Sequence, residues 1–124
     1  MSRHLPYIAV AAAAVSWACA CRSGTRDDAP PCSAVAARFL DLAKYDLAQA
    51  KVDEATAREV TDQLPAMRDA LAQACTDGKW SPAIRRCLVH AGDHVSFEGC
   101  EQQLTDEQRR DLDRANRAPG SATQ

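Results

Sequence analysis

The sequence has few aromatic residues and lacks the motifs by which many enzyme sites are found. Phenylalanine, tryptophan and tyrosine make up 5% of the 124 residues, and alanine supplies much of the 46% that is hydrophobic. Alanine favours helix but buries little surface, which predicts a thin core. The chain has no GxSxG nucleophile turn, no HExxH zinc motif and no glycine-rich phosphate loop. We therefore expect no enzymatic activity, no cofactor and no small-molecule substrate.

Charge of one sign is not concentrated in any part of the chain. Fifteen lysines and arginines stand against 17 aspartates and glutamates, which gives a net charge of −2. The charges are interspersed, as on a solvated helical surface, whereas a nucleic-acid partner requires a clustered basic face. We expect no nucleic-acid partner.

No apolar run reaches the roughly 20 residues that a membrane-spanning helix needs. The longest, residues 7–20, follows a short basic start at Arg3 and His4 and ends in small residues. A basic start, a short apolar run and a small-residue exit are typical of a secretory signal peptide. We predict a cleaved signal peptide over residues 1–20 and a polar tether over residues 21–31. The alternative is a buried N-terminal helix in a cytosolic protein.

Two modes of processing compete at the bond between Ala20 and Cys21. The segment Ala18-Cys19-Ala20 suits ordinary signal peptidase, and a small residue before a cysteine is the minimum for bacterial lipoprotein processing. The segment resembles a lipobox, although Ala18 stands where that pattern usually has leucine. We predict lipidation at Cys21, a lipid anchor in the membrane, and a place in the cell envelope facing the periplasm or the cell surface. Release as a secreted or soluble periplasmic protein is the alternative.

The number of cysteines agrees with export. The chain has six, of which processing would remove Cys19 and lipidation would consume Cys21. An even number then remains, as expected in an oxidising compartment. No CxxC or CxxCH spacing occurs, which argues against a zinc site or haem attachment. We predict disulfides among the remaining four, which are Cys32, Cys75, Cys87 and Cys100.

Apolar residues recur at helical spacing between residues 33 and 75. Ser33 can cap a first helix that runs to about residue 50, and Asp53 is an N-cap for a second helix that ends at residues 76–78. Pro65 lies inside the second helix and should kink or split it. We expect the second helix to bury an apolar stripe of Val60, Leu64, Met67, Leu71 and Cys75.

Helical signals continue after a glycine turn. Ser81 followed by Pro82 is a strong start signal for a third helix, which should end near Gly92. Apolar residues over 95–104 suggest a short fourth helix, and a last, highly charged helix should cover 104–117. Trp80 is expected to cover the core at the junction of two hairpins, and the following pair Arg85-Arg86 is expected on a solvated face.

No stretch alternates long enough to predict a strand. We therefore predict an all-α domain over residues 32–117, built of two linked antiparallel helical hairpins stapled by disulfides, with a disordered tail over residues 118–124. In an antiparallel hairpin, residues equidistant from the turn face each other. The predicted turns near residues 53 and 93 thus favour the pairs Cys32–Cys75 and Cys87–Cys100. Pairing of Cys75 with Cys87 and of Cys32 with Cys100 is the next alternative.

Two histidines form the only candidate metal site. His90 and His94 are four residues apart, and at this spacing two histidines on one helical face can bind a transition metal. Gly92 lies between them and should end the helix, which favours a polar turn. A metal-binding envelope protein is the last of the functional alternatives.

Residues 104–108 read LTDEQ, which matches the LTxxQ motif of the Spy/CpxP-like periplasmic chaperones. Those chaperones are small, exported and helical, and they cradle client proteins on a concave surface. They usually carry the motif twice and have few cysteines, whereas this chain carries it once. Thr105 and Gln108 also fit a helix capping box. The resemblance implies a client-binding chaperone as an alternative function.

A longer pattern, C-x4-W-S-x5-C-x12-C-x3-L-T-x2-Q, runs from Cys75 to Gln108. It resembles a family of small cysteine-containing lipoproteins of myxobacteria and covers roughly a third of the chain. The resemblance implies export and a helical fold, and it implies no particular activity. We therefore expect a structural or protein-interaction module at the cell envelope, with an envelope protein as its partner.

Overall fold

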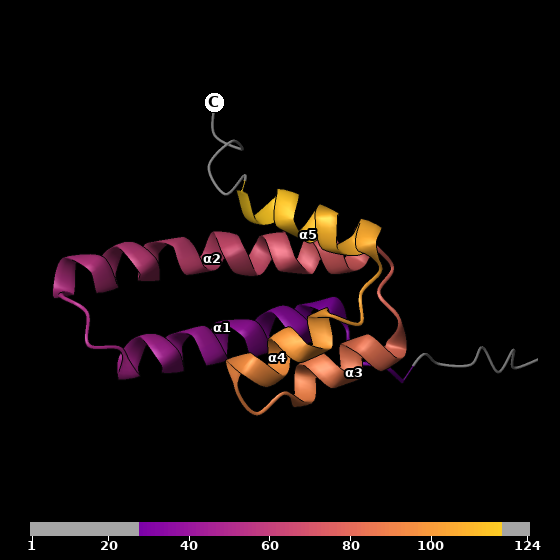
Figure 1. Ribbon diagram of the computed structural model, residues 1–124, viewed down its shortest axis with the longest axis horizontal. Coiled ribbons are helices and arrows are strands. Elements are labelled where there is room, and N and C mark those ends of the chain that lie inside the picture. The colour runs from indigo at the N-terminus through magenta and orange to yellow at the C-terminus, as the bar shows by residue number, and fades with distance from the viewer. Residues whose placement is uncertain (1–27, 118–124) are drawn as a thin grey trace, which may run out of the picture.

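The structure is a computed structural model that describes residues 28–117. The predicted leader, the predicted lipidation site Cys21, most of the predicted tether and the tail at 118–124 lie outside the described residues. Within the described part the chain is entirely helical, with no strand (Figure 1). The helices are α1 (Cys32–Gln49), α2 (Glu54–Asp77), α3 (Pro82–His90), α4 (His94–Glu101) and α5 (Asp106–Arg117).

Helices α1 and α2 form a long antiparallel hairpin on which the other three helices pack. A second, shorter hairpin of α3 and α4 lies against α1, and α5 lies along α2 (Figure 1). The predicted pair of linked antiparallel hairpins is confirmed. No described helix is both long enough and apolar enough to cross a membrane.

Short polar side chains begin helices α2, α3 and α4. Asp53, Ser81 and Asp93 each accept a hydrogen bond from the backbone N–H three residues further along the chain, at 3.0, 3.3 and 2.7 Å. Each bond satisfies one of the N–H groups that a helix start leaves without a partner. The caps at Asp53 and Ser81 are confirmed predictions, and the cap at Asp93 adds to them.

The prediction for the start of α1 is wrong, and of the two outcomes expected at Pro65 the split is not observed. Helix α1 begins at Cys32, with Pro31 in the N-cap position and no side-chain capping bond, so Ser33 lies inside the first turn. The fixed φ of proline, here −67°, already directs the chain into the helix. Pro65 does not split α2, which continues from residue 54 to residue 77 with Pro65 exposed. Packing of α2 against α1 and α5 offsets the lost backbone hydrogen bond.

The core lies where the two hairpins and α5 meet. Phe97, Leu88, Val35 and Cys75 are its most completely buried large side chains, and no polar or charged residue of the described chain is buried. Trp80 is 3% exposed and belongs to the same cluster, as expected for a residue at the junction of the hairpins. The core is small, in agreement with the scarcity of aromatic residues.

Two disulfides join the helices within each hairpin. Cys32 at the start of α1 is bonded to Cys75 in the last turn of α2, with their Cα atoms 5.7 Å apart. Cys87 of α3 is bonded to Cys100 of α4, with a Cα separation of 5.8 Å. This is the pairing that the symmetry of the cysteines about the two turns favoured. The first disulfide therefore fixes the open end of the long hairpin, and the second joins the interior of α3 to the last turn of α4.

Candidate functional site

The two candidate metal ligands do not share a helical face. His90 is the last residue of α3 and is exposed, whereas His94 is the first residue of α4. The Nδ1 atom of His94 lies 3.4 Å from a carboxylate oxygen of Asp46, and its ring meets Phe39 edge-on. No group of three or more potential metal ligands forms among residues 28–117. The helix break near Gly92 removes the spacing on which the metal hypothesis depends.

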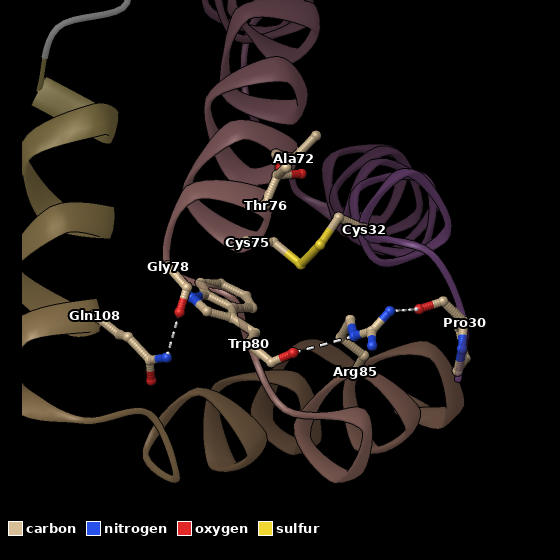
Figure 2. Close-up of a disulfide and its surroundings, with 9 residues drawn as sticks. All are labelled: Pro30, Cys32, Ala72, Cys75, Thr76, Gly78, Trp80, Arg85 and Gln108. Carbon is tan, nitrogen blue, oxygen red and sulfur yellow. Dashed lines mark hydrogen bonds between the residues drawn. A yellow bond between two sulfur atoms is a disulfide. The ribbon is translucent and has the colours of Figure 1, made fainter. Parts of the chain in front are cut away.

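The LTxxQ motif forms the start of α5 and attaches it to α2. The backbone N–H of Thr105 donates to the Gln108 side-chain oxygen at 3.0 Å, and the backbone N–H of Gln108 donates to the Thr105 hydroxyl at 3.2 Å. This reciprocal pair is a capping box. The Gln108 side-chain amide also donates to the carbonyl oxygen of Gly78 at 2.8 Å (Figure 2). Leu104 is buried in the core, so the residues of the motif stabilise the fold and do not form an exposed binding surface.

Gly78 allows the Trp80 indole to lie against the end of α2. A Cβ atom at Gly78 would lie 2.8 Å from the Ala74 carbonyl oxygen and 2.9 Å from the indole nitrogen, which is closer than packed atoms approach. The sequence marked Gly78 as a helix end and gave no sign of this contact. The indole nitrogen is buried without a hydrogen-bond partner in the described chain.

The point where the chain enters the domain is held by Arg85. Its Nε donates to the carbonyl oxygen of Trp80 at 3.2 Å, and its Nη1 donates to that of Pro30 at 2.8 Å (Figure 2). The expectation of a solvated face is therefore wrong for Arg85, which is partly buried, and right for Arg86, which is exposed. The first described residues are thus fixed beside the Cys32–Cys75 disulfide.

A second arginine, Arg38, also donates hydrogen bonds to a backbone carbonyl oxygen, here between the two hairpins. The Nε and Nη2 atoms of Arg38 on α1 both donate to the Ala91 carbonyl oxygen, at 2.8 and 2.6 Å. That oxygen lies at the end of α3, where carbonyl groups lack helical partners. The contact spans 53 positions of sequence and carries no local sequence signal. It fixes the second hairpin on the first.

The free end of the α1–α2 hairpin extends beyond the other helices (Figure 1). We call residues 43–63 the hairpin tip. None of them is buried, and Tyr45, Val52 and Val60 are 65%, 45% and 37% exposed. The expected burial of Val60 is wrong because the core cluster does not extend into the tip. The described chain has one further large exposed apolar residue, Val95 on α4.

The tip is mildly acidic. Five carboxylates and three basic side chains give it a net charge of −2: Asp46, Asp53, Glu54, Glu59 and Asp62 against Lys44, Lys51 and Arg58. Hydrogen bonds from the backbone and side chain of Thr56 hold the pKa of Asp53 below its usual value. A surface of exposed apolar groups among carboxylates suits a partner with apolar and basic groups.

Glu101, the last residue of α4, has a pKa that is shifted in the opposite direction, above its usual value. Burial, followed by the nearby charge of Glu98, raises the pKa of Glu101, while His94 lowers it and Asp113 raises it further. The contributing groups come from both α4 and α5, so the pKa shift results from the packing of these two helices.

Comparison of the chain with protein-family models, curated proteins and solved structures found no match.

Proposed function

We propose that this chain is exported, anchored in a membrane through a lipid on Cys21, and acts as a protein-interaction module of the cell envelope. The hairpin tip is the surface that would bind a partner. The observation that carries the proposal is the position of the tip at the opposite end of α1 from the point where the chain enters the domain (Figure 1).

The length of α1 sets the distance between the two ends. Its 18 residues, from Cys32 to Gln49, extend over about 27 Å at the usual rise of an α-helix. A lipid on Cys21 would hold the entry end, near Pro30 and Pro31, close to the membrane surface. The tip, with Tyr45 and Val52, would then face away from the membrane and be accessible to other envelope proteins.

Rigidity of the module supports binding by a small surface. The disulfides and the two arginine contacts fix the helices before any partner binds, so less conformational entropy is lost on association. The tip offers three large exposed apolar side chains, which is too little for an obligate interface. We therefore expect a transient complex, with affinity set by the few apolar contacts and by opposite charge on the partner.

Fractionation tests the anchor. Wild-type protein and a Cys19→Ser control should sediment with membranes, because the control leaves the predicted lipidation site intact. The Cys21→Ser variant should appear in the soluble fraction or keep its leader. If Cys21→Ser protein stays with the membranes at unchanged mass, the lipid anchor is refuted.

Cross-linking in envelope membranes tests the tip. A Tyr45→Asp variant places a charge on the tip, and Val95→Asp places the same charge on an exposed apolar position of α4. We expect one partner to cross-link with wild-type and Val95→Asp protein and to be lost with Tyr45→Asp. Equal recovery with both variants would show that the tip does not bind that partner.

A further inference from the structure

The two disulfides are alike in burial but differ in their surroundings. Each joins a partly buried cysteine, Cys32 or Cys87, to a buried one, Cys75 or Cys100. Burial of the cysteines therefore does not separate them. A difference in their reactivity toward an external thiol must come from the groups around each disulfide.

The Cys32–Cys75 disulfide lies in the wall of an open surface concavity of about 500 Å3. Lys79 and Arg85 line the same concavity, and none of the described carboxylates does. Two backbone carbonyl oxygens hold the Arg85 side chain on this side of α3 (Figure 2). An incoming thiol therefore approaches this disulfide past the cationic side chain of Lys79, while hydrogen bonds hold the Arg85 side chain in place.

The two sulfur atoms lie at helix ends of opposite polarity. Cys32 is the first residue of α1, whose start has no side-chain cap, and Cys75 lies in the last turn of α2. Free N–H groups at a helix start stabilise a neighbouring thiolate, and free carbonyl groups at a helix end destabilise one. Negative charge in the reduced form is therefore favoured on Cys32, the more accessible of the two.

The second disulfide differs from the first in its position within the helices and serves as an internal reference. Cys87 lies in the interior of α3, and Cys100 is the last residue but one of α4. The Cys87 sulfur accepts a hydrogen bond of 3.5 Å from the neutral side-chain amide of Gln103. Neither cysteine begins a helix.

We propose that the Cys32–Cys75 disulfide is a site of thiol–disulfide exchange with anionic low-molecular-weight thiols. The incoming thiolate bonds to the sulfur of Cys32, which is the more accessible of the two, and the bond to Cys75 breaks. The Cys75 sulfur takes the electron pair and a proton from water, because the end of α2 disfavours a thiolate there. A second thiolate attacks the outer sulfur of this mixed disulfide and releases the Cys32 thiolate. Two thiols are thereby oxidised to a disulfide, and the protein disulfide is reduced.

The test compares both disulfides in one molecule. Free thiols of the purified full chain are first blocked, and the protein is then exposed to 2-mercaptoethanesulfonate, which is anionic, or to cysteamine, which is cationic. The reaction is stopped by alkylation at intervals, and peptide mapping gives the opening rate of each disulfide. Circular dichroism at each time point records whether the helices remain.

With the anionic thiol, we expect Cys32–Cys75 to open about tenfold faster than Cys87–Cys100 while helix content is retained. With cysteamine, the ratio of the two rates should fall by at least about threefold. Lys79→Asn removes one charge and suits the left-handed backbone at this position, where φ is 47°. It should lower the ratio for the anionic thiol, whereas Lys44→Gln, a matched loss of charge on α1, should not.

Three results would overturn the proposal. One is faster opening of Cys87–Cys100 with the anionic thiol. Another is a rate ratio that does not depend on the charge of the thiol or on Lys79. The third is opening of both disulfides together with loss of the helices, because exchange would then follow unfolding and not the local charges.

Discussion

Removal of the Cys32–Cys75 disulfide should cost more stability than removal of Cys87–Cys100. The first closes a segment of 43 residues and the second a segment of 13. In the chain-entropy model, these lengths correspond to about 4 and about 3 kcal/mol of the free energy of unfolding. Substitution of both cysteines of a pair by alanine should therefore destabilise the protein in this order, with a small further cost for the space left at buried Cys75.

Urea unfolding and thermal melting, both followed by circular dichroism, measure the difference in stability between the two variants. For a domain of this size, a loss of about 4 kcal/mol lowers the melting temperature by roughly 15–30 °C. In the variant without the long cross-link, the free energy of unfolding should also fall more steeply with urea concentration, because its denatured chain exposes more surface. If loss of the short cross-link costs more than loss of the long one, stabilisation through the unfolded state is refuted for this protein.

Three further substitutions test individual contacts. Gly78→Ala should lower the free energy of unfolding by about 1–3 kcal/mol, and with it the melting temperature, because the added Cβ atom has no room. In Gly99→Ala on α4 the added Cβ atom meets nothing within 4 Å, so this variant should be neutral or stabilising. Asp93→Ala should destabilise at neutral pH, since hydrogen bonds from Ser96 lower the pKa of Asp93 in the folded state; urea titrations should show the difference shrinking as the pH falls through that lowered pKa. Glu101→Gln should stabilise at neutral pH, because the raised pKa of Glu101 means that its charged form is disfavoured in the fold; the difference should vanish below the unfolded pKa, and an unchanged pH profile would refute it.

Much of the fold could be predicted because its signals are local or symmetric. Asp53 and Ser81 indicate the starts of their helices, because each side chain accepts a hydrogen bond from the backbone N–H three residues further along. The cysteine pairs were predicted because each is centred on a turn, and an antiparallel hairpin brings such positions together. These features depend on short stretches of chain, which a single sequence shows directly.

The contacts that complete the fold depend on which helix faces which. Arg38 bonds to Ala91, and Gln108 bonds to Gly78, across 53 and 30 positions of sequence. Nothing in a helical pattern reveals such partners. Val60 fits an apolar stripe but lies in a part of α2 to which the core does not extend, so its exposure depends on the lengths of the other helices.

The most direct test of the account is the intact mass of the native protein extracted from membranes. We expect the mass of a chain that begins at Cys21, carries covalent lipid on that residue, and has lost four hydrogens to the two disulfides. After chemical reduction the mass should rise by those four hydrogens, and the lipid should remain. A chain with unmodified Cys21, or one that still carries residues 1–20, would contradict the proposal of a lipid-anchored envelope module.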